Sequence, residues 1–500
     1  MADSEICKSA NYEECVLKDV NTMTCSDNND VKSARKSDTF FLYFTIFTGS
    51  LPWFVGGMSI VWASPALTKL QLNDTEVNPI ERPIKPTEVS ALLVSQAVGG
   101  IIGTLLLPKL ADICGRKRSI QILSFVMILS TSGLAFSTYI ELIVFCAAIT
   151  VVAFCGIWGI CPIYITEICE DHNRAKFSCF IAASIPMGEL FCYIIGPSLS
   201  YKLYTMVMTL PLLLHLALSL FLPESPIFSL TKNKKTDCLI ALRKLRSNKS
   251  NEEINTDFEN MCNNLTKINN TKGLGVRQLL SIREGRIGLL LSLLPICVQN
   301  LCGVPLLMPL MAPIFNKSGS NLSGNIIAMY VGLVKIITFI TASMVVEKLG
   351  RKPLLITSSI GTEICMIVLG IFFYLKHINS SFVLQFQWVP LASILLYFIF
   401  YGFGLGPVPY SMISELFPSN LRSAASIIVL TAVGILIAVY LAVFLTLAEA
   451  IGIHWCMEMF ATMSFIGTVL FYMILPETKG KSTEEIQDIV KNLKIFKKRK

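Results

Sequence analysis

The chain has 500 residues, of which 53% are hydrophobic and only 15% are charged, and its formal net charge is +8. A mean hydropathy of +0.61 is too high for a soluble protein of this length, so the composition predicts an integral membrane protein. The positive charge lies in the connections between apolar stretches, so it indicates membrane topology and argues against nucleic-acid binding.

The first 38 residues are polar and mix Lys with Asp, without the basic-then-apolar pattern of a cleaved signal. We therefore expect residues 1–38 to form a cytosolic N-terminal tail. Cys7, Cys15 and Cys25 lie in this tail at spacings that match no zinc motif. Most of the other cysteines lie in apolar stretches, where a thiol is simply a small apolar group.

Apolar stretches of about 20 residues, the length that crosses the hydrocarbon core of a bilayer, follow this tail. The first six lie near residues 39–68, 87–108, 119–138, 140–166, 177–197 and 203–222. We expect residues 39–222 to form an N-terminal six-helix bundle. The longest predicted outside loop carries the sequon Asn73-Asp74-Thr75, so Asn73 is a candidate glycosylation site.

Residues 223–286 are the one sizeable polar segment between apolar stretches, and they are strongly basic. Amphipathic spacing predicts helices over residues 236–246, 251–265 and 275–283. We expect a cytosolic helical linker that lies against the ends of the bundle. An independent interaction module is the alternative.

Six further apolar stretches lie near residues 287–314, 324–346, 354–375, 386–413, 424–448 and 453–475. They predict a C-terminal six-helix bundle over 287–475, followed by a cytosolic tail, 476–500, with a capping box at Ser482 and Glu485. The expected fold is an all-α polytopic membrane protein with 12 transmembrane helices in two pseudo-symmetric six-helix bundles.

Lys and Arg orient these helices, because cytosolic loops carry the excess of basic residues. Basic residues follow the second and eighth stretches and also fill the linker and the C-terminal end, whereas the alternate loops are short or balanced in charge. We therefore predict a multi-pass protein of the cell membrane with both termini in the cytosol.

Three motifs occur once in each half, in the same order. The first half carries Asp112-x-x-Gly115-Arg116, Glu167 followed by Arg174, and Pro223-Glu224; the second half carries Glu347-x-x-Gly350-Arg351, Glu415 followed by Arg422 at the same spacing, and Pro476-Glu477. A duplicated membrane unit with charges at matched helix ends is typical of a transporter that works by alternating access.

The repeated charges lie at predicted cytosolic helix ends, and an Arg guanidinium can make bidentate bonds to a carboxylate. We expect them to form a cytosolic gate that locks the two bundles together on the inner face. The alternative is that they only follow the positive-inside rule. The expected gate residues are Asp112, Gly115, Arg116, Glu167, Arg174, Glu224, Glu347, Gly350, Arg351, Glu415, Arg422 and Glu477.

This motif set resembles that of the sugar porter branch of the major facilitator superfamily, which includes the facilitative glucose transporters, and the resemblance covers residues 40–490. Within the branch, Ser64-Pro65-Ala66-Leu67 and the stretch from Pro476 to Ser482 are most similar to trehalose transporter-like members. The resemblance implies a carrier for a sugar (trehalose or a hexose) or a related small polar solute.

The resemblance also implies substrate-binding positions. The family's seventh-helix glutamines fall on Gln299 and Asn300, and its tenth-helix aromatic residues fall on Tyr410 and Tyr401. Other sugar-bonding positions of the family hold residues that lack the expected group, namely Ala182, Pro305, Pro309, Leu310, Gly402, Val433 and Ile437. A changed substrate specificity is therefore expected.

Lys335 takes the place of the family's eighth-helix asparagine, near the middle of the membrane. A charge at that depth costs at least ~2.5–3.5 kcal/mol on insertion scales, so it should face a cavity and have a partner. Glu189 shares a face of the fifth predicted helix with Ala182 and Ile185. We predict that Lys335 pairs with Glu189 across the cavity, or that either contacts a charged substrate. A Lys335 that snorkels to an interface, or an alignment displaced by one turn, is the alternative.

The sequence carries no nucleophile elbow, phosphate loop, paired catalytic carboxylates or clustered histidines, so we expect neither an enzyme nor a metal or cofactor site. The expected partners are a small polar solute and the lipid bilayer, with no obligate protein partner. Met58 and Ser59 stand where proton-coupled relatives carry an Asp, which favours facilitated diffusion, although Glu189 near Lys335 leaves proton coupling open. The alternative functions are a non-transporting solute sensor or receptor, or a carrier repurposed for a charged or non-sugar solute.

Overall fold

A computed structural model describes residues 39–74, 77–270, 276–318, 320, 322–417, 419–479, 481, 485, 486 and 489. The expected N-terminal tail, the capping box at Ser482 and the end of the C-terminal tail lie outside the described residues. Within this part of the chain the regular elements are helices. Of these, 12 spans are long and apolar enough to cross a membrane, which confirms the predicted number.

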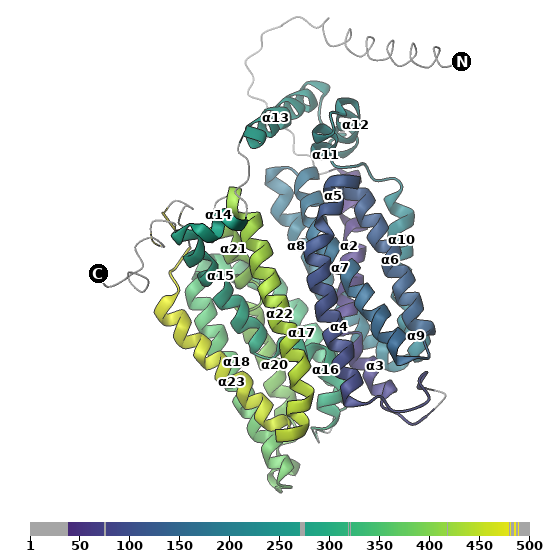
Figure 1. The fold of residues 1–500 in the computed structure, drawn as a ribbon, viewed down its shortest axis with the longest axis vertical. Coiled ribbons are helices and arrows are strands. Elements are labelled where there is room, and N and C mark those ends of the chain that lie inside the picture. Colours follow the sequence, from purple (N-terminus) through teal and green to yellow (C-terminus); the bar gives the residue numbers. More distant parts are fainter. Residues whose placement is uncertain are drawn as a thin grey trace, which may run out of the picture. The chain divides into compact units, whose positions relative to one another are not determined.

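The first six spans form the N half, shown in purple to blue in Figure 1. Its helices are α2 (Phe40–Val61), α3 (Ala63–Leu70), α4 (Pro86–Leu106), α5 (Pro108–Cys114), α6 (Arg116–Phe136), α7 (Ile140–Ile168), α8 (Asp171–Ser198), α9 (Tyr201–Val207) and α10 (Thr209–Ser219). Within this half α2 packs on α8, and α7 packs on both α4 and α6.

The last six spans form the C half, shown in green to yellow in Figure 1. Its helices are α15 (Arg283–Leu301), α16 (Val304–Asn316), α17 (Gly324–Leu349), α18 (Arg351–His377), α19 (Phe382–Gln385), α20 (Val389–Phe403), α21 (Val408–Leu416), α22 (Ser419–Ile451) and α23 (Ile453–Ile474). Here α18 packs on α20 and α23. The halves meet where α4 contacts α22, α8 contacts α17 and α3 contacts α16.

The segment between the halves also folds into helices. They are α11 (Pro226–Thr231), α12 (Lys235–Leu245), α13 (Asn251–Asn270) and α14 (Val276–Ser281). Leu230, Cys238, Leu242 and Ile254 form a small core of their own. Thr39, just before α2, donates to the Leu245 carbonyl over 2.8 Å, and Lys249 makes an ion pair with Glu170 at the start of α8. The linker helices therefore contact the N half, as the packed-linker prediction requires.

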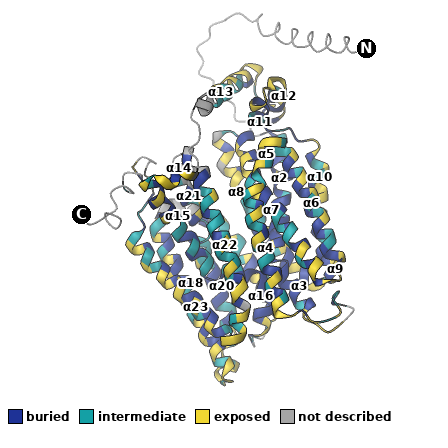
Figure 2. Cartoon of the chain, viewed as in Figure 1, coloured by how far each residue is buried: buried dark blue, intermediate teal, exposed yellow. Residues whose placement is uncertain are grey.

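Two faces of the helix bundles recur below. The linker face holds the ends where α10 leads to α11 and where α15 begins, and the loop face holds the opposite ends, including the loops from α3 to α4 and from α16 to α17. Figure 2 shows that exposed residues alternate with buried ones along the outer helices. On α22, for example, Ile435, Val439 and Val443 are exposed while Val433 is buried. An exposed apolar stripe of this kind suits contact with lipid.

Two of the spans, the seventh and the tenth, are interrupted. In the seventh, α15 ends at Leu301 and α16 begins at Val304, with Gly303 between them at φ 110°. Pro305 lies in the first turn of α16, directly after the break, and Pro309 lies inside α16. In the tenth span, α20 and α21 are separated at Gly404–Pro407.

Candidate transport site

Arg116 organises a charge cluster on the linker face of the N half. Its Nε lies 3.0 Å from Oε2 of Glu167 on α7, and its Nη2 donates to Oε1 over 3.0 Å. The two side chains are only 11% and 9% exposed. Asp112 on α5 adds a longer contact of 3.4 Å from a side chain that is 76% exposed. Shielding from water strengthens an ion pair, so the Arg116–Glu167 pair dominates this cluster.

Glu224 completes the N-half cluster by capping α6. Its Oε1 accepts from the backbone N–H of Lys117 over 2.9 Å. The first N–H groups of a helix lack partners within the helix, and the helix dipole favours a carboxylate there. Gly115 has a φ of 102°, and a Cβ at this position would lie 2.4 Å from Glu224 Oε2. Only glycine leaves room for the capping carboxylate.

The C half repeats this arrangement. Nε of Arg351 donates to Oε1 of Glu415 over 3.0 Å, between side chains that are 22% and 20% exposed. Glu477 accepts from the backbone N–H groups of Arg351 and Lys352, both over 3.0 Å. Gly350 has a φ of 91°, and a Cβ here would lie 2.9 Å from Glu477 Oε2. The second cluster is therefore more exposed than the first.

The environment of Glu477 favours its charged form. Burial alone would raise the pKa of this carboxyl, but hydrogen bonds from the backbone N–H groups of Lys479, Arg351 and Lys352 outweigh it and hold the pKa below its usual value. The cap is therefore a carboxylate at neutral pH.

Two ion pairs of the expected gate are seen among the described residues, and both lie within one half. Arg116 pairs with Glu167 in the N half, and Arg351 pairs with Glu415 in the C half. The reason is that each Arg follows the glycine turn of its own half and points back at that half's own α7 or α21. The side chains of Glu347 and Arg422 lie outside the described residues, so a lock between the bundles through Arg174, Glu347 and Arg422 stays a prediction.

Gln299 lies in the interior, on the last turns of α15, and is only 4% exposed. Its Nε2 donates to the Tyr401 hydroxyl over 3.1 Å and to the Gly406 carbonyl over 3.0 Å, where α20 gives way to α21. Its Oε1 is buried and has no hydrogen-bond partner among the described residues. An amide held rigidly by its nitrogen thus presents a bare acceptor.

Tyr410 lies on α21, four residues after Gly406. Its ring meets Trp158 of α7 edge to face, with centroids 6.3 Å apart, so this aromatic contact joins the two halves. Trp158 also packs edge to face on Trp53 of α2, at 6.5 Å. Gln299, Tyr401 and Tyr410 therefore gather around the α20–α21 break, opposite an aromatic wall from the N half.

Asn300 differs from its neighbour Gln299. Its Nδ2 donates to the Ile296 carbonyl over 2.7 Å, within its own helix. The Nδ2 group of Asn300, which was predicted to bond to the substrate, is therefore occupied by its own helix. Of the two predicted amides, only Gln299 is held toward the α20–α21 break.

Lys335 and Glu189 form the predicted ion pair. Nζ of Lys335 on α17 lies 2.5 Å from Oε2 of Glu189 on α8, and the side chains are 18% and 3% exposed. The Lys335 ammonium also lies 3.5 Å from Sδ of Met308 on α16. The pair therefore joins the halves inside the helical region, and Lys335 does not snorkel to an interface.

Two hydrogen bonds continue this contact toward the loop face. The Tyr193 hydroxyl of α8 donates to the Met308 carbonyl over 3.0 Å, and Oγ of Ser64 on α3 accepts from the Ala312 N–H over 2.9 Å. We refer to the six residues of this contact as the loop-side junction: Ser64, Glu189, Tyr193, Met308, Ala312 and Lys335.

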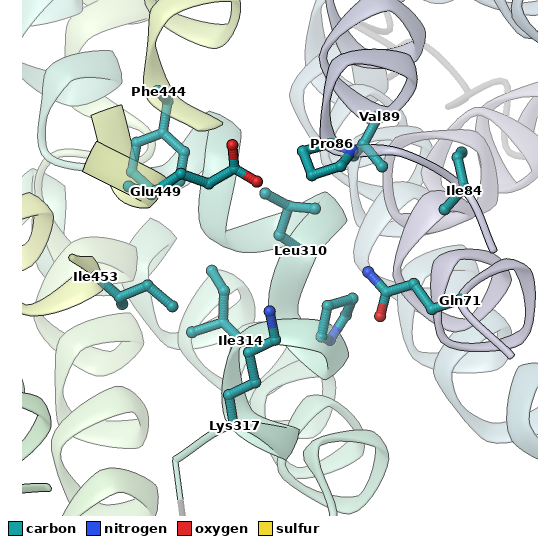
Figure 3. A pocket seen from close by; sticks show the side chains of 12 residues that line it. Gln71, Ile84, Pro86, Val89, Leu310, Ile314, Lys317, Phe444, Glu449 and Ile453 are labelled. Carbon is teal, nitrogen blue, oxygen red and sulfur yellow. The ribbon is translucent and has the colours of Figure 1, made fainter. Parts of the chain in front are cut away.

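A pocket of about 150 Å³ opens at the loop face between the halves (Figure 3). Gln71 and Val89 line it from the N half, while Leu310, Phe444 and Glu449 line it from the C half. Most of its lining is apolar, and it is smaller than a typical ligand site. Because it includes none of the predicted sugar positions except Leu310, it does not coincide with the predicted sugar site.

The sequence reasoning missed Trp158, Tyr193 and Ser64 as contacts between the halves. Trp158 carried a usable signal, since it is one of only five tryptophans and lies in the middle of an apolar stretch. Tyr193 lies one turn beyond Glu189 on the same face of α8, so the reasoning that selected Glu189 could have been extended to it. Ser64 was noted only as part of a family motif.

Comparisons with known proteins agree with this architecture. The family model described as "Sugar (and other) transporter" matches residues 41–490. The chain is 28% identical to the facilitated trehalose transporter Tret1 of Bombyx mori, over 94% of this chain and 91% of that protein, and 26% identical to the Tret1 of Culex quinquefasciatus, over 90% and 86%.

Among solved structures, the inward-open xylose transporter XylE of E. coli superposes with a TM-score of 0.72, at 21% identity, over 90% of this chain and 99% of that chain. The proton:xylose symporter XylE bound to 6-bromo-6-deoxy-D-glucose gives a TM-score of 0.68, also at 21% identity, over the same shares of the two chains. At this identity the likeness shows the fold, which is that of the major facilitator superfamily.

Proposed function

The chain belongs to the sugar (and other) transporter family, and on this premise we propose that it carries trehalose or a hexose by facilitated diffusion. The curated relatives described above are facilitated trehalose transporters, which makes trehalose the first candidate. The first span, Phe40–Val61, contains no acidic or basic residue, which supports transport without a coupled proton.

One observation carries the choice of a sugar. Gln299 is buried and fixed by two hydrogen bonds from its nitrogen, yet its Oε1 has no donor among the described residues. A buried acceptor without a partner is unfavourable unless a ligand or water supplies the donor. A sugar hydroxyl is such a donor, and the rings of Tyr401 and Tyr410 offer apolar faces beside it.

Proteoliposome uptake of labelled trehalose and glucose tests this proposal. We expect uptake by the wild-type protein, and about a tenfold loss of kcat/KM in Gln299→Ala, the equivalent of one lost hydrogen bond of about 1.4 kcal/mol. Asn300→Ala is the matched control and should lose less, because the Asn300 amide bonds to its own helix. Folded wild-type protein that takes up neither sugar would point instead to a sensor, the alternative that the comparisons do not favour.

We propose that transport uses alternating access with the loop-side junction closed in this state. Ser64, Tyr193 and Glu189 of the N half all bond to α16 or α17 of the C half, so opening the loop face requires these contacts to separate. Lys335 and Glu189 then act as a contact between the halves at the level of the cavity, where a polar solute would compete with the pair for hydrogen bonds.

The two linker-face clusters have a different part in this proposal. Because Arg116–Glu167 and Arg351–Glu415 each lie within one half, they brace the helix ends so that each half moves as a unit. Rocking of two rigid halves around a fixed site is the usual description of this kind of transport.

We propose that the linker face is cytosolic and the loop face external, in the cell membrane. Asn73 is exposed in the loop between α3 and α4, and it is the proposed glycosylation site. In cells, a glycosidase-sensitive mobility shift that disappears in Asn73→Gln would place the loop face outside. A C-terminal tag that is reached from outside intact cells would reverse this orientation.

A further inference from the structure

We infer that Tyr440 on α22 supplies a substrate-contacting hydroxyl that helps to set the sugar specificity. This inference rests on the proposed sugar transport. Val433 and Ile437, the positions on the same helix where sugar-bonding groups are expected, have apolar side chains. Tyr440 places a polar group on the same face of α22, one turn nearer the loop face.

The position of Tyr440 follows from the helical repeat. Val433, Ile437 and Tyr440 are spaced i, i+4 and i+7, so their side chains share one face of α22. That face is turned inward, because Val433 is buried while Ile435 and Val439, on the other side of the helix, are exposed.

Aromatic neighbours hold the Tyr440 ring beside the break in the seventh span. Its centroid lies 5.8 Å from that of Phe460 on α23 and 6.2 Å from that of Phe444. Phe460 in turn packs over Gly303, where an added Cβ would lie 2.7 Å from its ring. Gly303 separates α15 from α16 just after Gln299, so Tyr440 and Gln299 flank the same break.

The Tyr440 hydroxyl has no partner among the described residues, which distinguishes it from most of the buried tyrosines. Five of those donate to a backbone carbonyl within 3.2 Å: Tyr164 to Pro223, Tyr193 to Met308, Tyr201 to Leu134, Tyr204 to Trp62 and Tyr397 to Cys302. The Tyr440 oxygen is buried but makes no hydrogen bond to the described residues. A buried polar atom left unpaired in a packed interior needs a reason, and an absent ligand is one.

The two unpaired groups complement each other chemically. Oε1 of Gln299 can only accept a hydrogen bond, whereas the Tyr440 hydroxyl can donate one and accept another. Sugar hydroxyls both donate and accept, so a pyranose hydroxyl can satisfy either group. A purely apolar solute would leave both groups unpaired. A carboxylate has no hydrogen to donate, and its negative charge would be repelled by the Gln299 oxygen.

Sugar uptake by Tyr440→Phe, with the parent sugar and each of its monodeoxy analogues, tests the inference. We expect the KM for the parent sugar to rise by about 2- to 12-fold, the range that corresponds to one net hydrogen bond. The analogue that lacks the hydroxyl contacted by Tyr440 should show the same rise in KM with the wild-type protein. Its KM should not rise further with the variant. The melting temperature should stay unchanged or increase, because the variant removes an unpaired hydroxyl and keeps the ring.

Tyr397→Phe is the matched control, because its hydroxyl is bonded to the Cys302 carbonyl. It should lower the melting temperature and should affect all the sugars equally. A Tyr440→Phe protein whose KM equals that of the wild type for every sugar would overturn the inference and leave the proposed function standing. A wild-type protein that takes up no sugar would overturn both.

Discussion

The linker-face clusters and the proposed sugar site differ in how far the two halves repeat each other. Each cluster has an Arg–Glu pair, a glycine at positive φ and a glutamate that caps the following helix, so the second half repeats the first almost group for group. The proposed sugar site has no such repeat. Gln299, Tyr410 and Tyr440 lie in the C half, and from the N half Trp158 contacts Tyr410 while Trp53 packs on Trp158.

The difference separates two demands on a duplicated membrane protein. Both halves must keep their helix ends braced, so the same charged groups serve in both. A solute needs contacts that differ from one side to the other, so the cavity is free to diverge. Substitutions in the two regions should therefore affect different measurements, with stability dominant in one and substrate dependence in the other.

The largest expected effect is at the Lys335–Glu189 pair, where a cavity contact also has a structural role. Lys335→Ala or Glu189→Ala alone leaves a buried charge unpaired and should destabilise the protein by about 3 kcal/mol. The double variant should lose less than the sum of the two, because neither charge remains. Melting temperatures of the four proteins in detergent measure the coupling. Additive losses would show that the two charges act independently.

The second effect compares the two clusters directly. Glu167→Ala removes the partner of an Arg that is 11% exposed, whereas Glu415→Ala removes that of an Arg that is 22% exposed. We expect a loss of about 2–3 kcal/mol in the first case and about 1 kcal/mol in the second, since solvent screens the more exposed pair. The reverse order in thermal unfolding would contradict the assigned difference in shielding.

The third effect concerns the glycines of the same clusters. Gly115→Ala and Gly350→Ala each place a methyl group against a capping carboxylate at positive φ. A loss of about 1–3 kcal/mol is expected for each, larger at Gly115, where the Cβ would lie 2.4 Å from Glu224 Oε2 instead of 2.9 Å from Glu477 Oε2. Gly100→Ala on α4 is a control, since its nearest neighbour would be 3.6 Å away. Equal losses in all three variants would remove the steric argument.

The fold could be predicted because membrane spans are long, apolar and separated by charged connections. All 12 spans and the linker helix α12 lie within seven residues of their predicted bounds. The Arg–Glu pairs could also be expected, since both partners recur at fixed positions in the two halves. The sequence could not show whether each Arg pairs with a Glu of its own half or of the other half, because it does not give the distances between helices.

The candidate site was only partly predictable for a related reason. Gln299 and Asn300 are adjacent in the chain and chemically alike, and only the geometry shows that one points to the α20–α21 break while the other bonds to Ile296. Lys335 and Glu189 were found because a charge inside the membrane demands a partner. Tyr440 carries no such signal, since a tyrosine in an apolar stretch is ordinary until its hydroxyl proves to be unpaired.

The loop-side junction has a consequence for how easily the halves can part. Two of its bonds end on the main chain of α16, at the Met308 carbonyl and the Ala312 N–H. These two groups are four residues apart, so they are the natural partners of one another in an α-helix. Both groups lie inside α16, so when α16 leaves the N half they keep each other as helical partners, and no backbone group is left bare in the membrane interior. The two halves can therefore part without leaving an unpaired main-chain group on α16.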